Sequence, residues 1–174
     1  MGSYRKIEFT KFYLNLKSYR KSLLSNSNPY TPAVNLVFAL DEALKMMKEE
    51  GLDNIFLRHN KHKLAMSNAV KALNLKLFAD EKCLSPSITA IKTEGIDAEE
   101  FRKKIKNNFD ILLAGGQDHL KGKIFRVGHL GYVNDRDIIT VVSAMSITLL
   151  NLGKITAQQA GEALVVLSRY LEGN

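Results

Sequence analysis

The sequence has little cysteine and proline and no tryptophan. Of its 174 residues, one is cysteine and three are proline. The single Cys83 cannot form an intrachain disulfide, so nothing requires an oxidising compartment. No apolar run approaches the roughly 18 residues that a membrane-spanning helix needs, and the basic N-terminus is not followed by the apolar segment of a secretion signal. We therefore expect a cytoplasmic protein with no membrane partner.

The charge balance is basic, but charges of both signs are interleaved. There are 25 Lys and Arg against 18 Asp and Glu, a formal net charge of +7. A basic chain can bind nucleic acid or another polyanion. Runs such as Lys48-Glu49-Glu50 favour a solvated surface of mixed charge over a dedicated anion-binding face. No strand shows the paired aromatics of an RNA-recognition sheet, so we expect no nucleic-acid partner.

The hydrophobic pattern predicts an α+β fold. Residues 1–31 read as an extended lead-in with one short helix, and Thr31-Pro32 suits the start of a helix that ends at Gly51. Further helices are predicted over 53–73 and from Asp97, Asn134 and Thr156, and strands over 75–78, 87–91, 110–114 and 123–127. This order predicts a small, mainly antiparallel sheet covered by helices on one face.

The candidate metal and phosphate sites are weak. His59 and His62 stand three residues apart on a predicted helix, but no third ligand is near and lysines flank them, so we interpret both as surface histidines and expect no metal. His119 and His129 lie in loops and are expected to be structural. The glycine-containing segment 115–123 differs from a phosphate-binding loop in spacing and lacks its Ser or Thr, so we expect a hairpin-like connection.

Arg126 is the residue that the pattern singles out for binding. It lies in the apolar strand Ile124-Phe125-Arg126-Val127, on the same face as Ile124 and opposite Phe125. A buried unpaired charge is costly, so Arg126 needs an anionic partner, and a planar guanidinium suits a carboxylate held by two hydrogen bonds. Two interpretations remain open here: an edge-strand arginine in a structural ion pair, and an arginine that binds a carboxylate ligand.

Two separated motifs resemble the C-terminal small domain of class V, fold-type I pyridoxal-phosphate aminotransferases. One is the run from Gly115 to Val133, with Arg-Val-Gly-His-Leu-Gly at its centre. The other is Tyr30-Thr31-Pro32-Ala33-Val34, followed by Leu40-Asp41-Glu42-Ala43-Leu44, which resembles the segment where that family leaves its large domain. The resemblance is greatest to the alanine–glyoxylate/serine–pyruvate branch and covers roughly residues 9–152.

The resemblance implies a role for three residues. The family's arginine in this run binds the α-carboxylate of the amino-acid substrate, and Arg126 takes its place. The family's Thr-Pro threonine reaches the phosphate of pyridoxal phosphate in the neighbouring subunit, which assigns Thr31 to the cofactor and implies a homodimer. Some members use a tyrosine three residues earlier, where Asn28 stands here and can donate a hydrogen bond. The implied reaction transfers an amino group from serine or alanine to a 2-oxo acid such as pyruvate or glyoxylate.

The resemblance also places the catalytic residues outside this sequence. The family's Schiff-base lysine and the residues that hold the cofactor ring belong to the large domain, and no lysine here has a matching context. We therefore expect a lead-in from an absent large domain over 1–31, the aminotransferase C-terminal domain over 32–152 and an additional helix over 153–174. We expect no catalytic residue, and neither activity nor bound cofactor in this chain alone. A stand-alone basic α+β binding module, or a regulatory subunit that pairs with a separate large domain, is the alternative.

Overall fold

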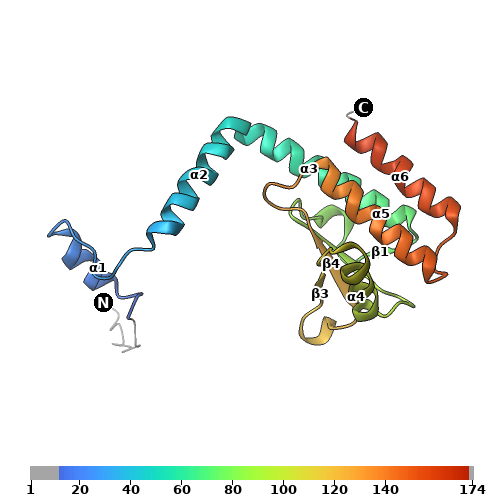
Figure 1. Ribbon diagram of the computed structural model, residues 1–174, viewed down its shortest axis with the longest axis horizontal. Coiled ribbons are helices and arrows are strands. Elements are labelled where there is room, and N and C mark those ends of the chain that lie inside the picture. The colour runs from blue at the N-terminus through green and yellow to red at the C-terminus, as the bar shows by residue number, and fades with distance from the viewer. Residues whose placement is uncertain (1–11, 173–174) are drawn as a thin grey trace, which may run out of the picture. The chain divides into compact units, whose positions relative to one another are not determined.

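A computed structural model describes residues 12–172 of the chain (Figure 1). The chain divides into two compact units, Met1–Glu49 and Glu50–Asn174, called unit 1 and unit 2 below. The domain boundaries expected at residues 31 and 152 stay predictions. Residues 1–11 of the expected lead-in lie outside the described residues, and the origin of this segment in a large domain stays a prediction.

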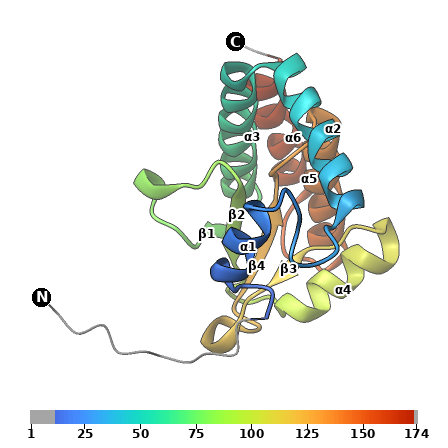
Figure 2. The same cartoon turned by 90° about the vertical axis from the view of Figure 1, so that its left-hand side faces the viewer.

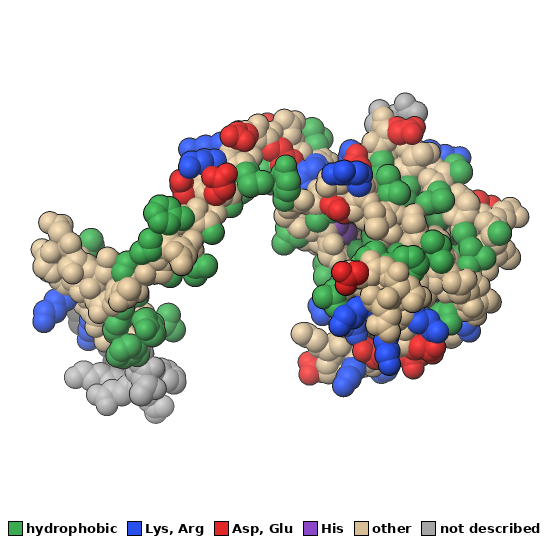
Figure 3. Space-filling view, viewed as in Figure 1, with side chains coloured by type: hydrophobic (Ala, Val, Ile, Leu, Met, Phe, Trp, Pro, Cys, Tyr) green, Lys and Arg blue, Asp and Glu red, His purple; other side chains and the backbone are tan. Residues whose placement is uncertain are grey.

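Over residues 12–49, unit 1 contains two helices and a small aromatic cluster. Helix α1 spans Leu16–Leu23 and helix α2 spans Val34–Glu50, and neither has a buried residue. Before α2, the ring of Tyr30 lies 4.7 Å from that of Phe12 and 4.8 Å from that of Tyr13, between centroids. The predicted apolar face of α2 exists but is uncovered: Leu36 is 71% exposed and Leu40 is 57% exposed (Figure 3).

Unit 2 contains four longer helices whose ends follow the sequence signals. They are α3 (Leu52–Ala72), α4 (Ala98–Phe109), α5 (Asp135–Asn151) and α6 (Ala157–Leu171). The Asp97 side chain caps α4, and capping boxes start α5 at Asn134 and α6 at Thr156. Figure 2 shows α3, α5 and α6 side by side, and all three pairs are in contact. Within the described residues, no helix is both long and apolar enough to cross a membrane.

The sheet is small and antiparallel, as predicted. Its strands are β1 (Lys76–Leu77), β2 (Ile88–Lys92), β3 (Ala114–Gly115) and β4 (Ile124–Gly128), in the order β1-β2-β4-β3. Short 3-10 helices span Glu81–Cys83 and Asp118–Leu120. Because β3 pairs with β4 in antiparallel fashion, the segment that joins them is the expected hairpin connection. Helix α3 contacts β1 and β2, and α4 contacts β3 and β4.

The strand predicted over 110–114 is mostly wrong. Asp110 adopts a left-handed conformation with φ 55° and ends α4, its N–H donating to the Lys106 carbonyl. The carbonyl of Leu113 accepts a hydrogen bond from Arg102 instead of joining the ladder at that point, and Leu112 is 77% exposed. The strand therefore begins only at Ala114.

The core of unit 2 lies between the helices and one face of the sheet. The rings of Phe101 on α4 and Phe125 on β4 are both fully buried, with centroids 4.9 Å apart. Helix α6 is part of this core, since Ala163 and Leu167 are 0% and 2% exposed. The face of β4 that carries Arg126 is the opposite one.

Candidate functional site

Arg126 lies in the middle of the sheet and not at its edge. Strand β4 has β2 on one side and β3 on the other, and Arg126 stands directly opposite Ala90 and Ala114. Both neighbours are small, so they leave room over the half-buried guanidinium. Arg126 Nε donates a hydrogen bond to the Gly115 carbonyl at 3.0 Å. Of the two interpretations left open, the edge-strand arginine is therefore wrong, while the alternation that opposes Arg126 to Phe125 is confirmed.

Arg126 has no acidic partner in the described part of the chain. Within residues 12–172, no Asp or Glu carboxylate lies within 4.0 Å of its guanidinium, and its hydrogen bonding to protein uses Nε alone. The structural ion pair is therefore ruled out among these residues. What remains is a half-buried cation whose terminal nitrogens are free for an anion from outside unit 2.

The loop that follows β4 is fixed by buried polar contacts. His129 is 0% exposed, and its Nδ1 donates to the Pro86 carbonyl at 3.1 Å, which leaves Nε2 to accept from Thr89 Oγ1 at 2.9 Å. Burial lowers the pKa of His129, so it is neutral at physiological pH. His129 is structural, as expected, and it holds the chain three residues beyond Arg126.

Arg58 fastens the next part of the same loop. Its Nη1 donates to the carbonyls of Gly131 at 3.0 Å and Val133 at 2.8 Å. Its Nε and Nη2 donate to the two carboxylate oxygens of Glu50, at 2.6 and 2.8 Å. The hydrogen bond from Arg58 holds the pKa of Glu50 below its usual range. Arg58 on α3 thus ties Glu50, the last residue of α2, to the loop after Arg126.

His59 and His62 are buried, contrary to the expectation of surface histidines. His62 is 0% exposed, and its Nε2 lies 2.8 Å from Asp135 Oδ1, while Lys61 Nζ lies 2.8 Å from Asp135 Oδ2. His59 Nδ1 donates to the Ile55 carbonyl at 2.8 Å. Among the described residues, no three His, Cys, Asp or Glu side chains are placed to hold a metal.

The second nitrogen of each ring, His59 Nε2 and His62 Nδ1, is a buried atom without a hydrogen-bond partner among residues 12–172. Burial lowers the pKa of His62 despite the hydrogen bond to Asp135, because a charged ring would bury an unpaired N–H. Burial alone would raise the pKa of Asp135, but hydrogen bonds from Lys61 and His62 outweigh it and the pKa is lowered. The cluster is a neutral histidine beside a carboxylate that Lys61 already balances.

The two predicted cofactor residues lie in unit 1. Asn28 and Thr31 are exposed in the connection before α2, and neither side chain makes a hydrogen bond within residues 12–172. Thr31 does not cap the helix, because α2 begins three residues later, at Val34. The predicted residues therefore do not form one site within a single unit: Arg126 belongs to unit 2.

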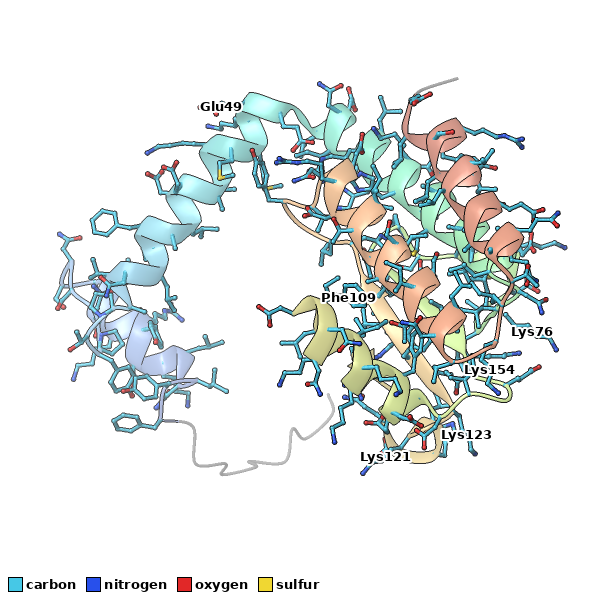
Figure 4. The ribbon with its side chains drawn as sticks, turned by 45° about the vertical axis from the view of Figure 1, so that its right-hand side comes forward. Glu49, Lys76, Phe109, Lys121, Lys123 and Lys154 are labelled. Atoms are coloured by element: carbon cyan, nitrogen blue, oxygen red, sulfur yellow. The ribbon has the colours of Figure 1, made fainter. Side chains whose placement is uncertain are left out.

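The lysines show no environment of a catalytic amine. None of those in residues 12–172 is buried. Figure 4 shows Lys76, Lys121, Lys123 and Lys154 at the surface of unit 2. A surface pocket of about 300 Å³ lies beside the ends of α4 and β4, where Leu113, Gly128 and Ile138 line it, but Arg126 does not.

Comparison with known proteins identifies relatives over most of the chain, although no family model matches it. The soluble hydrogenase 42 kDa subunit of Anabaena cylindrica is 52% identical over 151 residues, 87% of this chain and 39% of that protein. The soluble hydrogenase, small subunit, of Synechococcus sp. (strain PCC 6716) is 50% identical over 169 residues, 97% of this chain and 44% of that protein. The chain thus spans less than half the length of these relatives.

Other relatives carry aminotransferase names, among them serine–glyoxylate aminotransferases. Among solved structures, the ureidoglycine–glyoxylate aminotransferase of Bacillus subtilis superposes with a TM-score of 0.80 at 32% sequence identity, over 93% of this chain and 43% of that one. The match to the Synechococcus protein covers 97% of this chain, so most of α6 is included in it.

Proposed function

We propose that this chain, a homologue of the C-terminal region of class V aminotransferases of the serine/alanine–glyoxylate type, is the substrate-recognition part of such an enzyme. The complete enzyme would transfer an amino group from an amino acid such as serine or alanine to a 2-oxo acid such as pyruvate or glyoxylate. The family membership, the fold and the relatives' names support the reaction class.

The placement of Arg126 is the observation that carries this proposal. Both substrates of an aminotransferase bear a carboxylate, and Arg126 offers a cation on the open face of the sheet, between two alanines and without an acidic partner in residues 12–172. A guanidinium can hold such a carboxylate by two parallel hydrogen bonds. The fixed loop after β4 keeps the end of this strand in place.

The chain would contribute to cofactor binding through unit 1. Pyridoxal phosphate, when bound, supplies the electron sink for amino-group transfer. Thr31 and Asn28 fit its phosphate, because each is exposed and carries a side-chain donor that no protein group uses within residues 12–172. The neighbouring subunit would receive this contact, so we propose a homodimer, which light scattering on the complete enzyme would detect.

The chain alone would not perform the reaction, since covalent attachment of the cofactor needs an enclosed lysine. No lysine in residues 12–172 is buried. Mixing the chain with pyridoxal phosphate should give no stoichiometric, borohydride-reducible absorbance band assigned to one lysine. Such a band would contradict this part of the proposal.

A chimera tests the role of Arg126. In it, this chain replaces the matching region of the Anabaena cylindrica relative, which is 52% identical. We expect Arg126→Lys to lower kcat/KM for the amino donor about 30- to 1000-fold, because lysine cannot reproduce the bidentate contact. Cofactor absorbance should not change. Arg136→Lys, an exposed arginine at the start of α5, is the matched control. Unchanged kcat/KM in Arg126→Lys would refute the assignment.

The names of two relatives favour a second candidate. The relatives of Anabaena cylindrica and Synechococcus, 52% and 50% identical, are named hydrogenase subunits, which suggests a binding or regulatory module that pairs with other subunits. A chimera that folds and binds pyridoxal phosphate but transfers no amino group would favour this candidate over the first.

A further inference from the structure

We infer that the Gly115 carbonyl holds Arg126 so that only its two terminal nitrogens face the substrate carboxylate, and that Arg102 of α4 is the positioning residue that fixes this carbonyl. The inference rests on the proposed function of Arg126 as the carboxylate anchor. It specifies how Arg126 would bind the carboxylate, and it adds Arg102, which lies on the other side of the sheet.

The hydrogen-bond donors that Arg126 still has free decide how it can bind a carboxylate. A guanidinium can bind a carboxylate side-on, through Nε and one Nη, or end-on, through Nη1 and Nη2. Arg126 Nε already donates to the Gly115 carbonyl at 3.0 Å. Side-on binding would have to break that hydrogen bond. End-on binding keeps it, and the bond then fixes the direction in which the fork points.

The Gly115 carbonyl is free to accept a hydrogen bond because of its position on β3. Gly115 lies on the edge strand β3 and pairs with Phe125. The next residue, Gly116, donates its N–H to the Ile124 carbonyl at 3.1 Å. In an antiparallel pair, residues that exchange hydrogen bonds alternate with residues that do not. Gly115 therefore stands at a position that exchanges none with β4, and its carbonyl has no strand partner in the described part of the chain.

Arg102 lies on the opposite face of β3. Arg102 Nε donates to the Leu113 carbonyl at 2.7 Å, and Arg102 Nη1 donates to Glu99 Oε2 at 2.7 Å. A Cβ added at Gly115 would lie 2.6 Å from Arg102 Nη1, so glycine is what allows this close approach. Arg102 thus supports the short strand from the helix side, while Arg126 bonds to it from the open side.

Loss of Arg102 should loosen β3 and with it the acceptor of Arg126. We expect Arg102→Ala to raise KM for the amino donor about 3- to 10-fold, because it weakens one hydrogen bond, with little change in kcat. The carboxylate is bound equally in the ground state and the transition state, which is why the effect falls on KM.

The bond itself can be measured on the 174-residue chain without any ligand. We expect NMR to show the Arg126 Nε–H exchanging with water about 10-fold more slowly than the Nε–H of exposed Arg136. Arg102→Ala should remove most of this protection. Lys104→Ala, which removes a surface ion pair with Glu100 on the same helix, should not. If Arg102→Ala does not fold, Arg102→Gln is the substitute. Equal exchange at Arg126 and Arg136 would overturn the inference.

Kinetics in the chimera separate this inference from the proposed function. If Arg102 acts through Arg126, Arg102→Ala should raise KM about 3- to 10-fold in the chimera that keeps Arg126. In the chimera that already carries Arg126→Lys, it should raise KM less than about 2-fold. Equal effects in both backgrounds would show a merely structural role and overturn the inference alone. No effect of Arg126→Lys on kcat/KM would instead overturn the proposed function, even if the NMR protection is present.

Discussion

The two units use the same kind of sequence pattern with opposite results. Helix α2 in unit 1 is 17 residues long and buries none of them, whereas α3 in unit 2 buries seven. Both helices have apolar residues at helical spacing. The difference is the second surface: α3 packs against α5, α6 and the strands β1 and β2. Periodicity therefore specifies a helix and its inner face, but it does not specify which surface covers that face.

The polar contacts of the two units differ in the same way. In α2, Lys45 lies 2.8 Å from Asp41, one turn earlier, and both side chains are more than half exposed. In unit 2, Lys61 and His62 reach Asp135, more than seventy positions away in sequence. Contacts within one helix stabilise that helix only, while contacts between distant segments depend on the whole fold.

The largest expected effect contrasts two phenylalanines. Phe125 is 0% exposed and packs on Phe101, so Phe125→Ala should lower the free energy of unfolding by about 3–5 kcal/mol. Phe38 on α2 is 69% exposed, so Phe38→Ala should change it by less than about 0.5 kcal/mol in this chain. Urea unfolding of both variants measures the contrast. Similar losses would mean that another surface covers α2.

The features that could be predicted correctly from the sequence are those that local chemistry determines. Asp97, Asn134 and Thr156 each cap a helix where expected, because a cap needs only its own turn. The strand predicted over 110–114 failed because tertiary contacts decide that segment: Asp110 closes α4, and Arg102 takes the Leu113 carbonyl. Short apolar runs carry too little periodicity to reveal this.

The candidate site was predictable only in part. Arg126 stood out as a charge in an apolar strand, but its central position and its bond to Gly115 depend on a strand order that no local pattern contains. The burial of His59 and His62 was missed because their neighbours are lysines. Their spacing continues the inner face of α3 toward Met66, and that signal could have identified them as core residues.

The second prediction tests the long-range polar contacts. Arg58→Ala removes two hydrogen bonds to the carbonyls of Gly131 and Val133, and should lower the free energy of unfolding by about 1–3 kcal/mol. Lys45→Ala in α2 is the matched change in unit 1 and should cost less than about 0.5 kcal/mol. Urea unfolding at neutral pH compares them. Equal small losses would show that the loop after β4 does not depend on Arg58.

The smallest expected effect is a pH dependence confined to unit 2, which contains all four histidines of the chain. Burial lowers the pKa values of His62 and His129 below the ordinary 6.5. Between about pH 7 and pH 5 the unfolded chain therefore binds more protons than the folded one, and the free energy of unfolding falls as the pH falls. The lowered pKa values of Glu50 and Asp135 act later, below their ordinary 4.5 and 3.8.

A histidine variant tests whether His62 causes the loss of stability between about pH 7 and pH 5. His62→Gln keeps a donor near Asp135 but cannot titrate, so the loss of stability between about pH 7 and pH 5 should become smaller, with His129 supplying what remains. His119→Gln, at an exposed position in the β3–β4 connection, is the matched control. Urea unfolding at several pH values measures each slope. The same slope in His62→Gln as in the unchanged chain would mean that His62 takes up its proton over the same pH range in the folded and the unfolded chain, which would contradict the lowered pKa.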